Sequence, residues 1–276
     1  MRCVTEKIFL ATDRGPLRLL ILRPRRMPSS APGVLWIHGG GYVVGMPEMA
    51  YFSRARALAE KFGAVVVSPA YTLAGRAPYP AALLDCHQAL LYLKENAAQL
   101  GVRRDQLMVG GESAGGGLAA ALCMYEHDRG EISIAFQMPL YPMLDHRDTA
   151  TSRDNHAPVW NTRRNHKAWA CYLRGLTDQP IPAYASPALR TNYTGLPPAY
   201  TFICTAEPFY AETLAYVEAL RRAGVSATVD VYSGLFHAFD MLLPFLRVSR
   251  QAAAAFEQHF SDAAAHCFAP QPEDAH

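Results

Sequence analysis

Apolar residues recur along the chain with two alternating periods. Short apolar runs of the kind found in strands are followed by longer segments in which apolar residues have helical spacing. The first two runs, 6–11 and 17–22, are separated by a turn sequence containing Gly15 and Pro16, and they predict an antiparallel hairpin. The other predicted strands are 33–37, 64–67, 106–109, 131–138, 199–204 and 227–232, and the predicted helices are 49–62, 80–99, 114–127, 209–223 and 240–262.

A hairpin followed by repeated strand–helix units predicts an α/β fold with a mostly parallel central sheet of about eight strands, flanked by helices. The 276 residues suit a single domain spanning 1–276. Residues 146–190 interrupt the alternation, and we expect this insertion to form a reduced cap over one end of the sheet. The tail after Cys267 contains two prolines and several polar residues, so we expect it to be frayed.

Composition excludes several classes of protein. The net charge of +2, from 26 basic and 24 acidic residues, does not indicate a nucleic-acid partner or an anionic membrane. The six cysteines lack a C-x-x-C pair and are interpreted as free thiols in a reducing compartment. Neither an apolar leader nor a long apolar stretch is visible, which predicts a cytoplasmic protein without a membrane span. No ligand cluster is visible either, so no metal and no organic cofactor is predicted.

Residues 111–115, Gly-Glu-Ser-Ala-Gly, match the pattern G-x-S-x-G between a predicted strand and a predicted helix. A strand that turns into a helix with almost no loop holds the central Ser113 in a strained conformation with its hydroxyl exposed. The start of the helix also directs free N–H groups and its positive dipole end toward the site. A glycine-rich turn made for packing is the alternative, but the strand–helix context favours Ser113 as a nucleophile.

A second glycine-rich segment, His38-Gly39-Gly40-Gly41, directly follows a predicted strand. Acyl transfer develops negative charge on the former carbonyl oxygen, and preorganised N–H donors stabilise that charge. Consecutive glycines let the backbone approach a substrate closely, which favours Gly40 and Gly41, with Gly39 as a third candidate, as donors of an oxyanion hole. The N–H of Ala114 is predicted to be a further donor, and His38 to support the loop. A flexible loop is the alternative interpretation.

A serine hydroxyl is a poor nucleophile until a base takes its proton. Ten histidines are candidates for that base. His237 directly follows the predicted strand 227–232, and therefore lies at the same end of the sheet as Ser113. This position favours His237 over the structural role that an arbitrary histidine has.

The acid that orients the base is expected on the loop after the preceding predicted strand, 199–204. Glu207 is the only carboxylate on that loop and is the preferred candidate. Glu212, one turn into the next helix, is the second candidate, although an acidic residue there is usually a cap or a dipole partner. Asp145 and Asp230 are interpreted as structural.

Taken in order, these motifs resemble the hormone-sensitive-lipase-like carboxylesterases of the α/β-hydrolase superfamily. Residues 38–41 resemble the family's HGGG motif, and GESAGG at 111–116 resembles its GDSAGG elbow, with Glu112 in place of Asp. Gly234–Phe239 resembles the G-x-x-H-x-F site of the base, and 71–85, 141–145 and 186–187 also match. The resemblance implies an α/β-hydrolase fold and a serine carboxylesterase that works through an acyl-enzyme without a cofactor.

Two features depart from the family pattern. The family's acid usually lies in a D-P-L-x-D-E run, whereas this chain has Glu-Pro-Phe-Tyr-Ala-Glu at 207–212. The resemblance therefore implies that Glu207 replaces Asp on a shorter loop. The family often has helices ahead of the first strand that help to form a lid, whereas the predicted sheet begins at residue 6. Residues 146–190 are therefore expected to cover the site alone.

The resemblance implies small-molecule substrates, namely short-to-medium acyl esters. The same triad also serves an amidase, a deacetylase of acetylated sugars or a lactonase, and the sequence leaves these open. A non-catalytic binding protein on this fold is less favoured, because Ser113 and His237 are both present.

Aromatic residues of the insertion are candidates either for lining an apolar pocket or for packing the insertion. They are Trp160, Trp169, Tyr172 and Tyr184. A homodimer is a further possibility, with the final helix 240–262 and the edge region 199–204 as candidate contacts.

Overall fold

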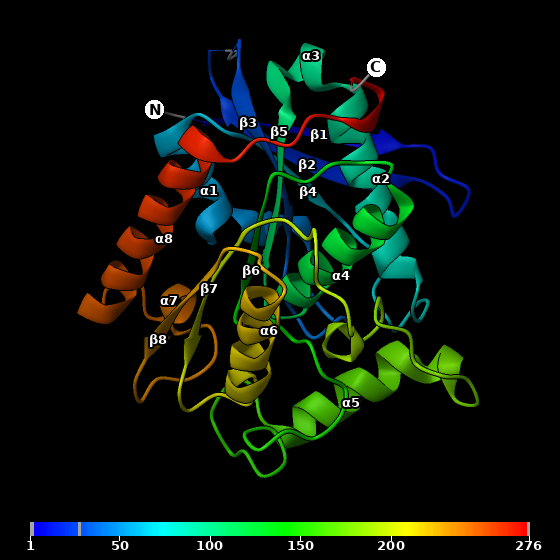
Figure 1. Cartoon of the computed structure of the whole chain (residues 1–276), viewed down its shortest axis with the longest axis vertical. Helices are drawn as coiled ribbons and strands as arrows, with labels where there is room; N and C mark the ends of the chain where they lie inside the picture. Colours follow the sequence, from blue (N-terminus) through cyan, green and yellow to red (C-terminus); the bar gives the residue numbers. More distant parts are fainter. Residues whose placement is uncertain (1–2, 27–28, 275–276) are drawn as a thin grey trace.

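The structure is a computed structural model that describes residues 3–26 and 29–274. Its strands are β1 (Cys3–Leu10), β2 (Leu17–Pro24), β3 (Ala31–Ile37), β4 (Val65–Pro69), β5 (Val102–Glu112), β6 (Phe136–Leu140), β7 (Ala199–Cys204) and β8 (Ala227–Tyr232). Within the described residues, eight strands form one sheet in the order β1-β2-β4-β3-β5-β6-β7-β8 (Figure 1). β2 pairs antiparallel with β1 and β4, and all other neighbours are parallel. The predicted hairpin and the predicted α/β fold are confirmed.

Helices cover both faces of this sheet. α1 (Arg54–Phe62) and α8 (Arg247–His266) lie together on one face (Figure 1). α2 (Ala81–Glu95), α4 (Ala114–Arg129) and α6 (Tyr210–Arg222) lie on the other face. The carboxyl ends of the parallel strands therefore remain available for loops, which is where functional residues of such sheets lie.

Three of the predicted helices are divided. Segment 49–62 becomes η1 (Pro47–Tyr51) and α1, because the Ser53 side chain caps α1 by accepting a hydrogen bond from a backbone amide. Segment 80–99 becomes α2 and α3 (Ala97–Leu100). Segment 240–262 becomes α7 (Phe239–Leu242) and α8, and the turn between them contains Pro244, which has no amide hydrogen to donate within a helix.

β7 and β8 have the predicted bounds, but other strand predictions need correction. Predicted strand 106–109 is the centre of the longer β5. The prediction of a strand over 131–138 is wrong at its start, because β6 begins at Phe136. The edge role expected for 199–204 is also wrong, since β7 pairs with β6 on one side and β8 on the other.

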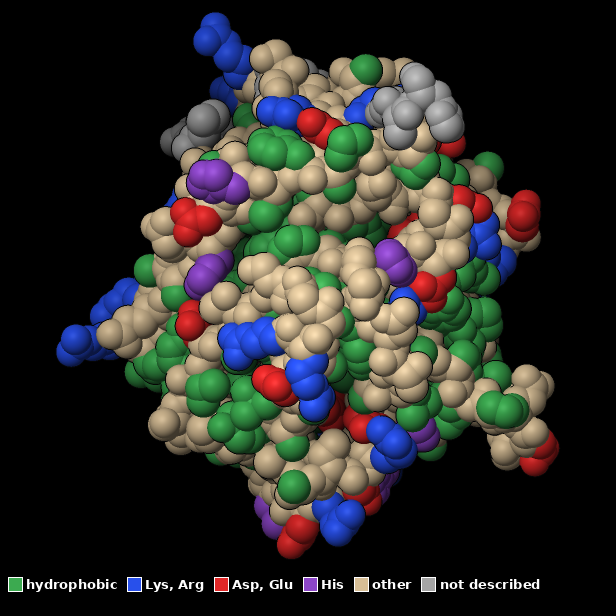
Figure 2. Space-filling model, viewed as in Figure 1, with side chains coloured by type: hydrophobic (Ala, Val, Ile, Leu, Met, Phe, Trp, Pro, Cys, Tyr) green, Lys and Arg blue, Asp and Glu red, His purple; other side chains and the backbone are tan. Residues whose placement is uncertain are grey.

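The central strands are buried, and aromatic rings pack between the sheet and its helices. Trp36 on β3 meets Phe256 on α8 edge to face, with ring centroids 5.8 Å apart. Charged side chains of both signs are scattered over the face drawn in Figure 2. In the part of the chain that is described, no helix has the length and apolar character needed to cross a membrane.

The predicted insertion, 146–190, contains α5 (Thr162–Leu173), η2 (Arg174–Leu176) and η3 (Pro187–Leu189). Two of its aromatic residues, Trp169 and Tyr172, are buried. Tyr172 stacks on Tyr42 with ring centroids 4.0 Å apart, and its carbonyl accepts a hydrogen bond from the Tyr79 amide at 2.8 Å. These contacts fasten the insertion to the loops that follow β3 and β4.

The C-terminal tail is docked, so the expectation of a frayed tail is wrong for residues 268–274, which include η4 (Pro272–Asp274). Gln271 is completely buried. Its side chain donates to the carbonyls of Arg104 at 2.8 Å and Ser133 at 3.0 Å, and accepts from the Ser133 amide at 3.1 Å. One side chain therefore satisfies backbone groups at the beginning of β5 and in the segment that precedes β6.

We predict that Gln271→Ala lowers the free energy of unfolding by about 2 kcal/mol, because it leaves buried backbone groups without partners. Urea denaturation followed by circular dichroism measures the change. Gln251→Ala, at an exposed position of α8, is the control and is expected to change stability by less than about 0.5 kcal/mol. An effect at Gln271 as small as at Gln251 would contradict a docked tail.

Candidate active site

Ser113 lies in the sharp turn between β5 and α4. Its backbone has φ 59° and ψ −121°, a conformation that side chains rarely adopt. A Cβ atom on Gly111 or Gly115 would collide with the carbonyl oxygen of Ile37 on the adjacent β3. The glycines of the predicted elbow are therefore required by close approach of β3, and the strained turn presents the Ser113 hydroxyl at the carboxyl end of β5.

The structure brings Ser113, His237 and Glu207 together. His237 Nε2 lies 2.8 Å from Ser113 Oγ, and His237 Nδ1 is hydrogen-bonded to Glu207 Oε2. Glu207 Oε1 accepts a hydrogen bond from the Cys204 amide at 3.0 Å, which fixes the carboxylate. All three functional side chains are buried. Because Glu207 follows β7 and His237 follows β8, the order of strands in the sheet delivers both to Ser113.

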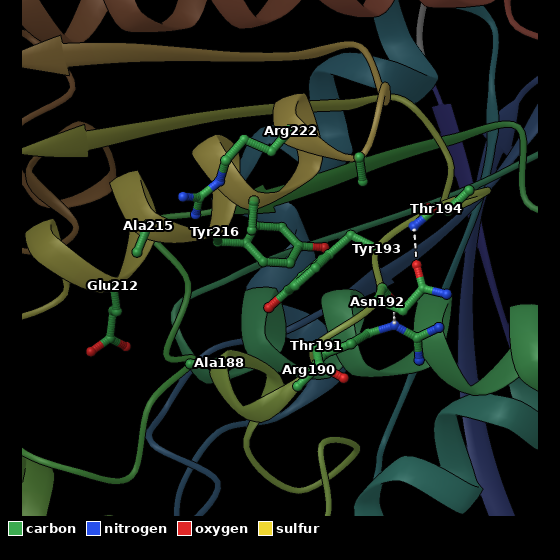
Figure 3. A pocket seen from close by; sticks show the side chains of 12 residues that line it. Ala188, Arg190, Thr191, Asn192, Tyr193, Thr194, Glu212, Ala215, Tyr216 and Arg222 are labelled. Atoms are coloured by element: carbon green, nitrogen blue, oxygen red, sulfur yellow. Dashed lines mark hydrogen bonds between the residues drawn. The ribbon is translucent and has the colours of Figure 1, made fainter.

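Glu212, the second candidate for the acid, contacts other groups. One of its carboxylate oxygens accepts from the Leu144 amide at 2.7 Å and from the Asp145 amide at 3.3 Å. Burial raises the pKa of the Glu212 carboxyl well above its usual range. Its side chain borders a separate cavity of about 520 Å³ between α6 and residues 188–194 (Figure 3). Glu212 therefore supports the loop after β6.

The other two carboxylates considered from the sequence also have structural contacts. Asp145 forms an ion pair with Arg147, with 2.9 Å between Oδ1 and Nε. Asp230 accepts a hydrogen bond from the Tyr200 hydroxyl at 2.8 Å. Neither carboxylate is hydrogen-bonded to His237, whose Nδ1 is occupied by Glu207.

Gly39, Gly40 and Gly41 form a loop beside Ser113. Gly40 has φ 118° and Gly41 has φ 61°, so glycine suits both positions. Within the part of the chain that the structure describes, the amide groups of these three glycines and of Ala114 donate to no protein acceptor. Free N–H groups next to a nucleophile are what an oxyanion hole requires.

His38 holds this loop in place. Its ring stacks on Tyr71 with centroids 4.2 Å apart, and Nδ1 lies 2.8 Å from the Gly39 carbonyl oxygen. The Tyr71 hydroxyl donates to the His38 carbonyl at 3.1 Å. Burial lowers the pKa of His38 to about 4, so the imidazole is neutral at pH 7. These contacts agree with the supporting role expected for His38.

Ser113 and His237 open into a cavity of about 420 Å³, a size typical of small-molecule sites. Trp160 lines it, as one interpretation of the sequence expected, and also packs against Gly41. Trp169 and Tyr172 are buried elsewhere, and the Tyr184 hydroxyl donates to Asp128 at 2.6 Å.

Sequence reasoning missed several residues that line this cavity: Val44, Met49, Tyr141, Met241 and Leu242. Tyr141 packs edge to face on the His237 ring, with centroids 5.0 Å apart. The matching segment 141–145 was a signal for Tyr141, but its role was not assigned. Met241 and Leu242 are placed by the turn that divides the final helix, which the apolar periodicity did not predict.

Glu112, beside Ser113, is a buried carboxyl outside the Ser–His–Glu hydrogen-bonded chain. Trp36 Nε1 lies 3.0 Å from one of its oxygens and 2.9 Å from the other. Burial, and then the charge of Asp240, raise the pKa of Glu112 to about 8. Asp240 in turn pairs with Arg54, with 3.0 Å between Nη2 and Oδ2. Glu112 is therefore mainly protonated at pH 7 and serves as a neutral partner for the indole.

Among residues 3–26 and 29–274, one group of three has donor atoms close enough to hold a metal ion. The donor atoms of His87, Glu126 and Glu131 lie within 4.8 Å of one another. His87 Nδ1 already lies 2.6 Å from Glu126, however, and Glu131 is paired with Arg129. None of these residues lines the cavity of Ser113.

Comparison with known proteins identifies related sequences and structures. A family model described as the alpha/beta hydrolase fold matches residues 34–241. The esterase LipI of Mycobacterium tuberculosis is 32% identical over 238 residues, which cover 84% of this chain and 74% of the relative. The carboxylesterase NlhH of the same species is 32% identical over 221 residues, covering 78% and 69%. The structure of a bacterial heroin esterase matches with a TM-score of 0.90 and 29% identity, covering 95% of this chain and 84% of that chain.

We predict that Glu112→Gln reduces the loss of stability at alkaline pH. The folded protein binds a proton at Glu112 up to about pH 8, whereas the unfolded chain releases it near 4.5. Stability from this group is therefore lost progressively as pH rises from about 4.5 to about 8, because over that interval the unfolded chain releases a proton that the folded protein retains. Between pH 7 and 9 the wild type is expected to lose about 1 kcal/mol more than the variant, measured by urea denaturation.

Glu218→Gln, which removes an exposed carboxyl on α6, is the control for this measurement and is expected to follow the wild type. Identical pH dependence of the wild type and Glu112→Gln would contradict a protonated Glu112.

Proposed function

Because this chain belongs to the hormone-sensitive-lipase-like carboxylesterases of the α/β-hydrolase superfamily, we propose that Ser113, His237 and Glu207 are its catalytic triad. The chain is a carboxylic ester hydrolase, as the resemblance of its motifs predicted. The observation that carries the assignment is the continuous hydrogen-bonded chain from Ser113 Oγ through the His237 ring to Glu207, with 2.8 Å between Oγ and Nε2.

The chemistry proceeds in two steps. His237 Nε2 takes the Ser113 proton while Oγ bonds to the carbonyl carbon of the ester, and the carbonyl oxygen becomes an oxyanion. The bond to the alcohol oxygen then breaks, and His237 gives the proton to that oxygen, which leaves an acyl-enzyme. Water, deprotonated by His237, attacks the acyl group and releases the acid and Ser113. Glu207 orients the imidazole and stabilises its protonated form.

The oxyanion is held by backbone amides. We assign this role to Gly40, Gly41 and Ala114, with Gly39 as an additional candidate, because their N–H groups donate to no acceptor among the described residues. Each such donor typically contributes about 3–4 kcal/mol to stabilisation of the transition state. Trp160 and the rest of segment 146–190 serve as the cap that excludes water from this loop.

The apolar walls of the cavity favour short-to-medium acyl esters as substrates. Three other compound classes remain alternative substrates, because each contains an acyl carbonyl carbon that Ser113 can attack: amides, acetylated sugars and lactones. Six free cysteines support a reducing, cytoplasmic setting.

We predict that Ser113→Ala lowers kcat/KM for p-nitrophenyl butyrate by about four to six orders of magnitude, because no nucleophile remains. Glu207→Gln is expected to lose about four orders, since the histidine is no longer held in the correct tautomer. The substrate class is established by measuring kcat/KM for further compounds alongside, namely p-nitrophenyl acetate and decanoate, an anilide and an acetylated sugar.

Glu212→Gln is the matched control for the acid, and its activity is expected to stay within about tenfold of the wild type because the Glu212 carboxylate accepts from two backbone amides and is not hydrogen-bonded to His237. A loss at Glu212→Gln equal to that at Glu207→Gln would contradict the assignment of the acid. An inactive wild type on all three compound classes, the nitrophenyl esters, the anilide and the acetylated sugar, would contradict ester hydrolysis by this site.

A further inference from the structure

Large hydrophobic side chains are exposed around the mouth of the catalytic cavity. Eight such side chains are exposed among the described residues, and five of them lie in segments that border this cavity. We call these five the apolar rim: Val44, Met46, Phe52, Leu242 and Phe245. Their concentration in one place is informative, because apolar residues scattered singly over a surface need no explanation, whereas a contiguous group marks a contact.

The two segments of the apolar rim are neighbours in space. Val44 and Leu242 both line the cavity, so the loop after β3 and the end of α7 meet there. A buried ion pair between Arg54 and Asp240, with 3.0 Å between Nη2 and Oδ2, joins the beginning of α1 to α7. Phe52 precedes Arg54 by two residues and is 79% exposed, the highest value of the eight.

The end of α7 and the turn that joins it to α8 have an unusual composition for a surface. Residues 241–246 are Met-Leu-Leu-Pro-Phe-Leu, six apolar residues in succession. Leu242, Pro244 and Phe245 are exposed. The Leu246 amide donates to the Leu243 carbonyl at 3.1 Å, which holds Phe245 at the tip of a tight turn. Packing inside the fold does not require these exposed apolar groups, so they indicate an external contact.

Basic side chains accompany the apolar rim. Arg164 lines the mouth of the cavity, and Arg247 and Arg250 follow Phe245 at the start of α8. All three are exposed, and no described carboxylate lies within 4 Å of any of them. The acidic residues of the same segments are engaged, since Glu48 pairs with Lys7 and Arg18, and Asp240 is buried. The local charge is therefore positive, although the net charge of the whole chain is only +2.

We propose that the apolar rim and its three arginines dock on the surface of an anionic phospholipid bilayer. Apolar side chains at the tip of a turn enter the boundary between headgroups and acyl chains, and the guanidinium groups bind phosphate oxygens. Docked in this way, the cavity mouth faces the lipid, and an ester dissolved in the bilayer reaches Ser113 without crossing water. Docking goes beyond the proposed hydrolysis and does not depend on it.

Charge argues for a lipid rather than a second copy of the chain. In a symmetric dimer the same patch meets itself, so the arginines of one copy would share the interface with the arginines of the other. Like charges brought together in an interface oppose association. An anionic headgroup layer supplies the opposite charge to the arginines and an apolar interior to the apolar rim.

The test is flotation of the protein with vesicles of phosphatidylcholine alone or of phosphatidylcholine and phosphatidylglycerol in equal amounts. The wild type is expected to bind the anionic vesicles, and binding is expected to weaken as salt is raised. Phe52→Ser/Phe245→Ser is expected to lower the partition coefficient at least tenfold. Arg247→Gln and Arg250→Gln are each expected to lower it about fivefold.

Phe268→Ser is the matched control, because Phe268 is also exposed but packs on Arg103 near the amino end of β5. It is expected to bind as the wild type does. Ser113→Ala is also expected to bind fully, which separates docking from hydrolysis. The Phe52→Ser/Phe245→Ser variant is expected to hydrolyse dissolved p-nitrophenyl acetate at the wild-type rate. This activity shows that the variant is folded.

Three outcomes would overturn the proposal. The first is a wild type that does not float with anionic vesicles. The second is a Phe52→Ser/Phe245→Ser variant that binds them as the wild type does. The third is a dimer of the wild type in light scattering that this variant dissociates, since the apolar rim would then be an interface between two copies.

Discussion

The backbone of Ser113, held at φ 59° and ψ −121° between β5 and α4, is the constraint on which the rest of the site depends. The turn is possible only where no Cβ occupies the space between Gly111, Gly115 and the Ile37 carbonyl. Because the register of β3 and β5 places Ile37 opposite Gly111, the glycine loop after β3 emerges beside Ser113. One close contact between two strands thus positions both the Ser113 hydroxyl and the glycine loop beside it.

Four buried carboxyl groups surround this turn, and their partners give each a different role. Glu207 meets the imidazole of His237, and Asp240 meets the guanidinium of Arg54. Glu112 accepts from the indole N–H of Trp36, and Glu212 accepts from two backbone amides. Burial raises the pKa of Glu112 and Glu212, and it also raises the pKa of Asp240 in spite of the ion pair with Arg54. The hydrogen-bond partner, more than the residue type, therefore distinguishes the proposed triad acid from the structural carboxyls.

The elements that the sequence predicts well are those in which one local pattern decides the structure. β7 and β8 follow from β-branched and aromatic runs bounded by turns, and the elbow follows from glycines that close contact requires. A local sequence pattern carries no information on tertiary contacts such as the hydrogen bonds from Gln271 to two backbone segments. The prediction of a frayed C-terminal tail was therefore wrong. Pro244 divides the last helix and exposes Phe245, whereas the apolar periodicity around it continues without a break.

The most direct test of the central claim is covalent labelling with an alkyl p-nitrophenyl phosphonate, followed by mass spectrometry of the intact protein and its peptides. Displacement of nitrophenolate by an activated serine leaves a stable phosphonyl ester that resembles the tetrahedral intermediate. The account predicts one phosphonyl group on Ser113 of the wild type, slower labelling of Glu207→Gln, and no labelling of Ser113→Ala. Labelling of another residue, or undiminished labelling of Ser113→Ala, would contradict the assignment of the nucleophile.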